Sequence, residues 1–198
     1  RLLEALSHRA TASEADFKPQ AVANTLWALA TMGVEADERL LEALSHRATA
    51  SAADFKPQEV ENTLWAFCLL QPSLLPGLCG TLLSGGRELG EMASCQLHQV
   101  FVTMQLKEEL WSKVPPNVRT VHSEIGGDCK QQFQQRQPMV SGFQREVSAA
   151  VRSMGLELIE EAVDEESSYS LDILLRKDAA DAPSYALEAK SGWAVEVN

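Results

Sequence analysis

The N-terminal part of the chain repeats itself with a period of 38 residues. Residues 1–29 align with residues 39–67 without a gap, and 25 of the 29 positions are identical. A period of this length is typical of a unit made of two helices, and such units bury their apolar faces only by stacking on their neighbours. The repeat therefore predicts an α-helical solenoid that recognises its ligand through an extended surface.

Each unit is expected to contain two amphipathic helices. The first begins near Pro19, which suits a first helical turn, and ends at Gly33, which suits a C-terminal cap. The second runs from about Asp37 to Thr49. Apolar spacing predicts one buried face on each helix. These faces comprise Val22, Leu26, Leu29 and Ala30, then Leu40, Leu41, Leu44 and Ala48, with Glu38, Arg39, Glu42 and Arg47 in solvent.

The two copies differ at four pairs of positions, and two of these pairs lie early in the first helix. In a modular reader, scaffold positions are copied while ligand-facing positions vary. Neutral change on a solvated face is the alternative, and two copies are too few to exclude it. We expect Trp27 and Trp65 to pack in the core rather than to stack on bases. The candidate RNA-binding residues are Lys18, Lys56, Ala21, Ala23, Asn24, Glu59, Glu61 and Asn62.

The middle of the chain carries weaker signals. Residues 92–106 have helical spacing of apolar residues at Leu97, Val100, Phe101 and Met104, and we interpret them as a degenerate repeat helix. His98 on this helix is expected to be structural. Residues 117–138 are rich in Gln and predict a linker or a loose helical connection. The four cysteines, Cys68, Cys79, Cys95 and Cys129, form no C-x-x-C pair and are interpreted as buried reduced thiols.

The pattern changes to mixed helix and strand after Ser141. An amphipathic helix is predicted from Phe143 to Met154, with Phe143, Val147, Ala150 and Val151 on its apolar face and Gly155 at its end. Strands are predicted over residues 156–159, 169–175, 185–190 and 193–197, with turns between them.

This order of helix and strands matches the core of PD-(D/E)xK nucleases. Glu188 and Lys190 are two residues apart on a strand and share a face, and Asp172 on a neighbouring strand is expected to meet them. Two carboxylates so placed hold Mg²⁺, which activates water, while the lysine orients that water. Glu146 on the preceding helix is a further candidate. The alternative is that Glu188 and Lys190 form an exposed strand face, because such a short motif also occurs by chance.

Two segments resemble known families. Residues 55–66, FKPQEVENTLWA, look like the octotricopeptide-type, FAST-kinase-like helical repeats of algal and protist organellar proteins. Residues 154–161, 169–173 and 193–198 resemble the RAP domain, whose fold is similar to the PD-(D/E)xK endonucleases and which commonly follows such repeats. The resemblance implies binding of organellar RNA, with each repeat touching about one nucleotide, and location in a mitochondrion or chloroplast.

The C-terminal segment departs from the RAP pattern in two ways. Asn198 stands where the pattern continues into Asp-Gly-Pro, and an additional strand-like stretch containing Glu188 precedes the last strand. The second carboxylate is therefore ambiguous between Glu188 and Glu196. We expect three parts, and the last is a truncated, restriction-endonuclease-like α/β domain. The parts are 1–70 with two tandem repeats, the second incomplete, then 71–138 with a degenerate helical segment and linker, and 139–198 with the RAP-like domain.

The charge of the chain limits its classes of partner. The formal net charge is −11, and no third of the chain is basic. Nucleic-acid binders gain most of their affinity from neutralising phosphates, so this balance favours an alternative, an armadillo-like or HEAT-like solenoid that binds proteins. The RNA interpretation predicts maturation, stabilisation or Mg²⁺-dependent cleavage of organellar transcripts. We expect no membrane insertion and no small-molecule substrate, and the sequence leaves open whether the last domain is a ribonuclease.

Overall fold

The computed structural model divides the chain into two units, residues 1–133 and residues 134–198. The first is helical, and the second combines a helix with a small sheet. No helix within the described part is long and apolar enough to cross a membrane. The described residues are 17–33, 36–84, 95–135, 140–164, 167–175 and, for the backbone only, 91–94, 176, 187–189 and 192–195.

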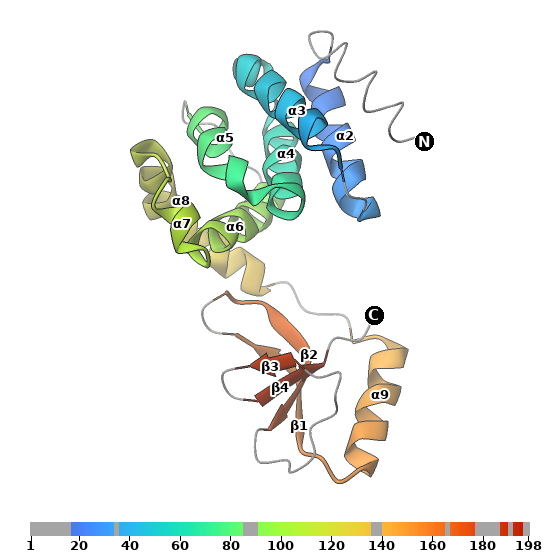
Figure 1. The fold of residues 1–198 in the computed structure, drawn as a ribbon. Helices are drawn as coiled ribbons and strands as arrows, with labels where there is room; N and C mark the ends of the chain where they lie inside the picture. Colours follow the sequence, from blue (N-terminus) through green and yellow to red (C-terminus); the bar gives the residue numbers. More distant parts are fainter. Residues whose placement is uncertain are drawn as a thin grey trace. The chain divides into compact units, whose positions relative to one another are not determined.

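In the helical unit, alternate helices of the chain pack on one another (Figure 1). α2 packs along α4, α4 packs along α6, and α3 packs on α5. The elements are α2 (Pro19–Met32), α3 (Glu38–Ala50), the 3-10 helix η2 (Ala52–Asp54), α4 (Pro57–Leu70), η3 (Pro72–Leu74), α5 (Leu75–Leu82), α6 (Glu91–Gln105), α7 (Glu108–Trp111) and α8 (Pro116–Gln135).

One continuous apolar core joins these helices. The eight apolar residues predicted to be buried in the first unit are all in this core, and so are the four predicted in residues 92–106. α4 supplies the centre of the core, because it packs against two long helices, α2 on one side and α6 on the other. Its fully buried residues include Val60, Leu64, Ala66 and Phe67.

The ends of α2 and α3 follow from local chemistry. Pro19 occupies the first turn of α2, and Gly33 ends the helix in the left-handed region at φ +61°, which favours glycine. Asp37 caps α3 by accepting a hydrogen bond from the backbone N–H of Arg39 at 2.9 Å. The prediction for Arg47 was wrong: its Nε donates to the carbonyl of Phe17 at 2.7 Å, so the side chain is half-buried rather than solvated.

The segment interpreted as a linker is largely a regular helix, α8. Pro116 suits its first turn, and Val118, Val121, Ile125 and Cys129 follow helical spacing and contact the core. His122 lies on the same side, with its ring edge-on to Phe101 at 4.8 Å and to Trp111 at 5.4 Å between ring centroids. The two glycines within α8 do not interrupt it, because tertiary packing outweighs their low helix propensity.

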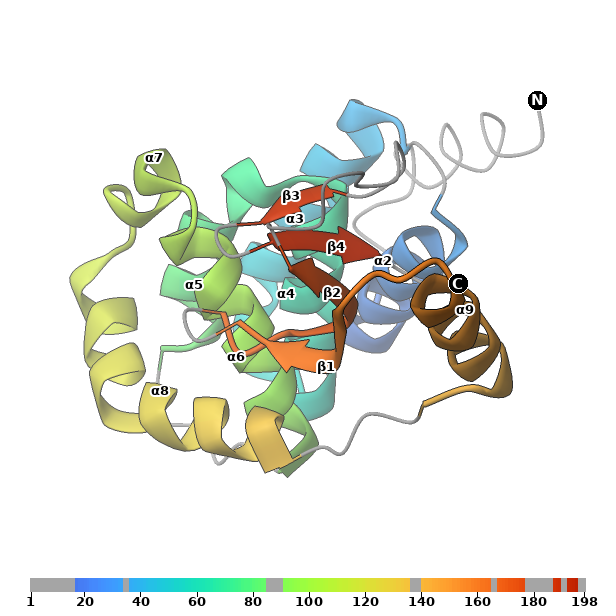
Figure 2. The same ribbon diagram turned by 90° about the horizontal axis from the view of Figure 1, so that it is seen from below.

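The second unit contains α9 (Gly142–Ser153) and an antiparallel sheet of strand order β1-β2-β4-β3 (Figure 2). The strands are β1 (Leu158–Val163), β2 (Ser170–Arg176), β3 (Leu187–Ala189) and β4 (Gly192–Val195). β1 begins and ends later than predicted, and it includes the acidic pair Glu160 and Glu161.

The small core of this unit joins one side of α9 to one face of the sheet. Val151 packs with Ile173 and Leu175, and Val147, Leu156 and Leu158 flank them. The predicted apolar face of α9 was partly wrong, because Phe143 is 57% exposed and Ala150 is also exposed. The polar residues Gln144 and Ser148 are buried in their place.

The two adjacent glycines of α8 offer a matched test of its packing. A Cβ at Gly126 would lie 2.9 Å from Cδ2 of His122, whereas a Cβ at Gly127 would meet no atom within 4 Å. We expect Gly127→Ala to stabilise the chain by up to about 1 kcal/mol, the gain in helix propensity. Gly126→Ala should forfeit that gain, because it displaces a ring held between Phe101 and Trp111. Urea unfolding followed by circular dichroism measures both, and equal gains would contradict the packing of His122.

Candidate functional site

The first helices of the two repeat copies each carry a polar and aromatic stripe. In α2 the exposed residues Gln20, Asn24, Trp27 and Thr31 are spaced four, three and four apart, which places them on one side of the helix. The equivalent residues of α4 are Gln58, Asn62, Trp65 and Leu69. Because α2 packs along α4 with repeated sequence, the two stripes form one surface, which we call the stripe face. We take the stripe face as the candidate ligand surface of the helical unit.

Trp27 was predicted to be in the core, and this prediction was wrong. Its side chain is 45% exposed, whereas the equivalent Trp65 is half-buried against the core. The difference follows from position, since α4 has α6 as a further neighbour and Asn62 accepts a hydrogen bond from Gln96 of α6 at 3.4 Å. An exposed indole beside the exposed amide of Asn24 supplies a stacking platform and a hydrogen-bonding group.

Two lysines stand at the same end of the stripe face. Lys18 and Lys56 are exposed and occupy the N-cap positions of α2 and α4 with nearly equal backbone angles. The positive end of each helix dipole adds to these charges. The copies differ in one respect: Glu59 accepts a hydrogen bond from the backbone N–H of Lys56 at 2.8 Å, while Ala21 at the equivalent position of α2 offers no such acceptor. The end of α2 is therefore the more open to an anion.

For two of the candidate RNA-binding residues, the prediction that they face a ligand was wrong. Ala23 and Glu61, the equivalent positions of α2 and α4, are only 1% and 4% exposed. They lie on the packing side of their helices, so their exchange is not a change on a ligand surface. Burial raises the pKa of the Glu61 carboxyl above its ordinary value. Among the candidates, the structure leaves Lys18, Lys56, Ala21 and Asn24 exposed, with Glu59 and Asn62 half-buried.

The candidate nuclease residues do not form one cluster within the described residues. Glu146 is exposed on α9, and Asp172 is half-buried on β2. The register pairs Leu175 with Trp193 and Trp193 with Glu188, which puts Glu188 in the row of Leu175. Asp172 is three residues from Leu175, and successive rows alternate between faces, so the rows of Asp172 and Glu188 belong to opposite faces. Lys190 and Glu196 lie outside the described residues.

A polar contact that the sequence did not reveal joins α9 to the sheet. Gln144 is 4% exposed, and its Nε2 donates to Oε1 of Glu161 at 2.6 Å and to the backbone carbonyl of Asp172 at 3.2 Å. Glu161 has φ +52°, and the ladder between β1 and β2 omits the pair that it would form with Asp172. The side-chain amide of Gln144 thus donates a hydrogen bond to the Asp172 carbonyl at the point where the pairing of β1 with β2 is interrupted. Gln144 was predicted to lie off the apolar face, and the available signal was its position three residues before Val147 and seven before Val151.

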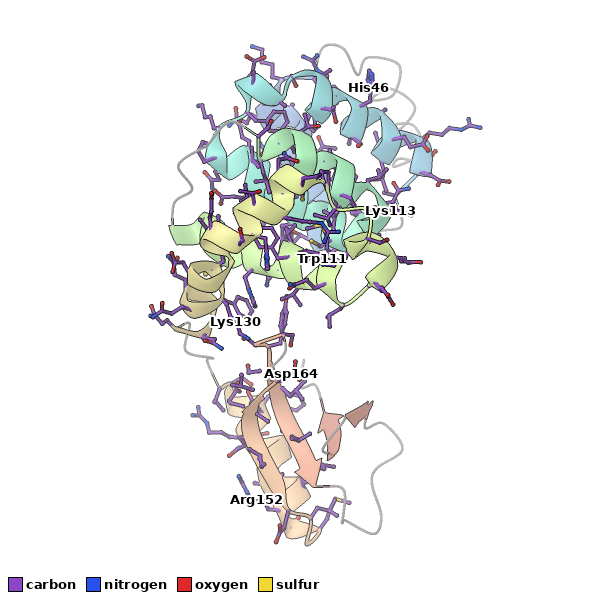
Figure 3. The ribbon with its side chains drawn as sticks, turned by 90° about the vertical axis from the view of Figure 1, so that its left-hand side faces the viewer. His46, Trp111, Lys113, Lys130, Arg152 and Asp164 are labelled. Atoms are coloured by element: carbon purple, nitrogen blue, oxygen red, sulfur yellow. The ribbon has the colours of Figure 1, made fainter. Side chains whose placement is uncertain are left out.

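Glu160 and Arg152 form an exposed ion pair beside this contact. The guanidinium of Arg152, at the end of α9, lies 2.7 Å from Oε2 of Glu160 on β1 (Figure 3). Its hydrogen bond lowers the pKa of the Glu160 carboxyl. Exposed pairs of this kind contribute little to stability. We therefore assign the pair to positioning α9 rather than to chemistry.

Burial affects two of the thiols and one of the histidines in the described helices. All four cysteines are free, and burial raises the pKa of Cys68 to about 12 and that of Cys79 still further, so both are protonated thiols near neutral pH. His98 is buried with its ring 4.8 Å from that of Phe133, as its structural interpretation predicts. The described residues also contain no group of three or more His, Cys, Asp or Glu side chains arranged to hold a metal ion.

No family model, curated protein or solved structure matches the chain.

Burial of Glu61 predicts a pH-dependent stability. Its pKa is higher in the folded than in the unfolded chain, so the ionised carboxyl destabilises the fold above the raised pKa, and this cost disappears as the pH falls below about 4.5. Glu61→Gln removes the charge and should raise Tm at pH 7 by about 2–4 °C for each kcal/mol regained. The gain should shrink at pH 4. Thermal unfolding at both values, with the exposed Glu42→Gln as control, measures it, and a gain independent of pH would contradict the assignment.

Proposed function

We propose that the helical unit is part of a solenoid that binds single-stranded RNA across the stripe face. The observation that carries the proposal is the exposed Trp27 beside Asn24, with the cation Lys18 at the same helix. Single-stranded nucleic acid is bound by aromatic platforms on which bases stack, combined with cations that contact the backbone. Amide side chains add hydrogen bonds to base edges. The resemblance of residues 55–66 to octotricopeptide-type repeats supports the same ligand.

The proposed RNA contacts are expected to differ in strength between α2 and α4. Trp27 offers an open ring face, whereas Trp65 is half-buried and Asn62 is engaged by Gln96. The first turn of α2 after Lys18 contains no acidic residue, whereas Glu59 caps the N-terminus of α4. We therefore assign the strongest RNA contacts to α2 and weaker ones to α4.

For the second unit we propose an RNA clamp. Its resemblance to the RAP domain supports organellar transcripts as the target, in a mitochondrion or chloroplast, and a role in their processing or stability. A ribonuclease site built on Asp172 and Glu188 does not fit the register, which assigns them to opposite faces. We derive no Mg²⁺-dependent step from these residues. The alternative is cleavage with Glu196 as the second carboxylate.

A second candidate function is binding of an extended peptide on the same face. It is favoured by charge: α2, α4 and α6 contain no Lys or Arg, so Lys18 and Lys56 are the cations at the ends of these helices. The net charge of −11 acts in the same direction. Amides and indoles also bind peptide backbones and side chains. The salt dependence of binding separates the two candidates.

The RNA proposal predicts unequal effects of the two lysines. We expect Lys18→Gln to reduce the slope of log affinity against log salt by about 0.7, the value for one phosphate contact on a single strand. Lys56→Gln should have a smaller effect because Glu59 lies nearby, and Lys113→Gln, beyond α7, should have none. Fluorescence anisotropy with a labelled single-stranded RNA of about 12 nucleotides measures each slope. Affinity that does not depend on salt would favour the peptide alternative.

Trp27→Ala tests the stacking contact separately. Loss of one stacked base costs roughly 1–3 kcal/mol, or about 5- to 150-fold in affinity. Because Trp27 is 45% exposed, its removal should leave Tm nearly unchanged, so that weaker binding is not caused by unfolding. An unchanged affinity with Trp27→Ala, together with an unchanged salt slope with Lys18→Gln, would place the RNA elsewhere.

The clamp proposal predicts that Mg²⁺ does not stimulate cleavage through Asp172. We expect the same rate of RNA degradation with Mg²⁺ and with EDTA, for the unmodified chain and for Asp172→Asn alike. A gel assay of an end-labelled transcript measures these rates. Mg²⁺-dependent cleavage that Asp172→Asn abolishes would overturn the clamp and favour the site with Glu196.

A further inference from the structure

A hollow lies where the C-terminal ends of α2 and α4 meet the start of α3. Its volume is about 480 Å³, and it is open to solvent on one side. Its walls are mostly apolar. The lining residues are Ala30, Gly33, Ala36, Glu38, Leu41, Leu69, Leu70 and Gln71. These residues belong to the ends of the helices, so the hollow is distinct from the Lys18 and Lys56 end of the stripe face.

The electrostatic character of the hollow is negative. Residues of the last turns of α2 and α4 line it, and the carbonyl groups of such turns carry partial negative charge. Neither last turn contains a basic residue to neutralise this charge. Glu38 adds a carboxylate, and none of the lining residues is cationic. The C-terminal ends of α2 and α4 and the carboxylate of Glu38 therefore contribute negative potential to one hollow, and the N-terminal end of α3, where Glu38 lies, offsets part of it.

The walls favour an aliphatic chain. Leu41 is buried at the base, while Leu69 is 60% exposed and offers apolar surface to any group that enters. A ligand that fits must combine an apolar stem with a positive end, because a bare cation would leave the leucines in water and a hydrocarbon would leave Glu38 uncompensated. Lysine side chains and small aliphatic amines share this chemistry.

We propose that this hollow is a binding site for an alkylammonium group, supplied by a free aliphatic amine or by a lysine side chain of a partner. The stem lies along Leu69 and Leu70, and the ammonium lies toward Glu38 and the two helix ends. The inference does not rest on RNA binding at Lys18, Asn24 and Trp27, and Leu69 is the residue that the hollow shares with the stripe face.

The test is a titration of the full chain with n-butylammonium chloride, followed by the backbone amide signals of Gly33, Leu41 and Leu69 in two-dimensional NMR at low salt. n-Butanol is the matched neutral probe. We expect saturable shifts with n-butylammonium and weaker binding with n-butanol. Glu38→Gln should weaken n-butylammonium binding about 2- to 5-fold, the range of an exposed charge pair. Leu69→Ala should weaken both probes, because it removes apolar wall.

Glu42→Gln is the matched control, because Glu42 is exposed on the same helix and does not line the hollow. It should leave n-butylammonium binding unchanged. Equal affinity for n-butanol and n-butylammonium, or equal losses with Glu38→Gln and Glu42→Gln, would overturn the proposal. Nα-acetyl-lysine-N-methylamide distinguishes the sources: binding comparable to n-butylammonium supports a partner lysine, and binding of n-butylammonium alone supports a free amine.

Discussion

The packing of α4 between α2 and α6 is the interaction on which the helical unit depends. α4 buries residues toward both neighbours, including Val60, Leu64 and Phe67, and each of these is fully inaccessible to solvent. Removal of apolar surface from water on two sides offsets the entropy cost of ordering a helix that would be marginal alone. Among the described helices α2 packs along α4 alone, and the indole of Trp27 on α2 is more exposed than that of Trp65 on α4.

The two near-identical repeat copies separate the structural properties that depend on local sequence from those that depend on packing partners. The bounds of α2 and α3, their caps and their buried apolar residues could be predicted from one copy, because Pro19, Gly33 and Asp37 act on adjacent backbone groups. Exposure of Trp27 could not, because the same residue in the second copy is half-buried. Packing partners differ between copies even where the sequence does not. Burial of Ala23 could not be predicted either, because alanine occurs on both the buried and the exposed side of a helix.

The errors in α8 and in the sheet have different physical origins. Gln-rich sequence with Gly126 and Gly127 lowers helix propensity, and only the contacts of His122 and its apolar neighbours with the core compensate for it. In the sheet, the alternation within each strand was predictable, but the register that puts Asp172 and Glu188 in rows on opposite faces was not. Register between strands depends on turns and bulges, and a shift of one residue exchanges the two faces. Glu161 is such an irregularity, and nothing in its neighbours predicts φ +52°.

The positions of Glu59 and Glu61 in the structure also change the interpretation of the acidic exchanges between the copies. Ala21 to Glu59 and Ala23 to Glu61 add two formal charges to the second copy, which suggests a strongly acidic ligand surface. One of these carboxylates caps its own helix at 2.8 Å, and the other is 4% exposed on the packing side. Their effect on a ligand is therefore local, at the N-terminus of α4, rather than spread over the stripe face. A polyanion is disfavoured at Lys56 more than at Lys18, and an uncharged strand of peptide is disfavoured at neither. The negative charge of the chain therefore bears first on the part of the surface that RNA could contact, which is the Lys18 end of α2 rather than the Lys56 end of α4.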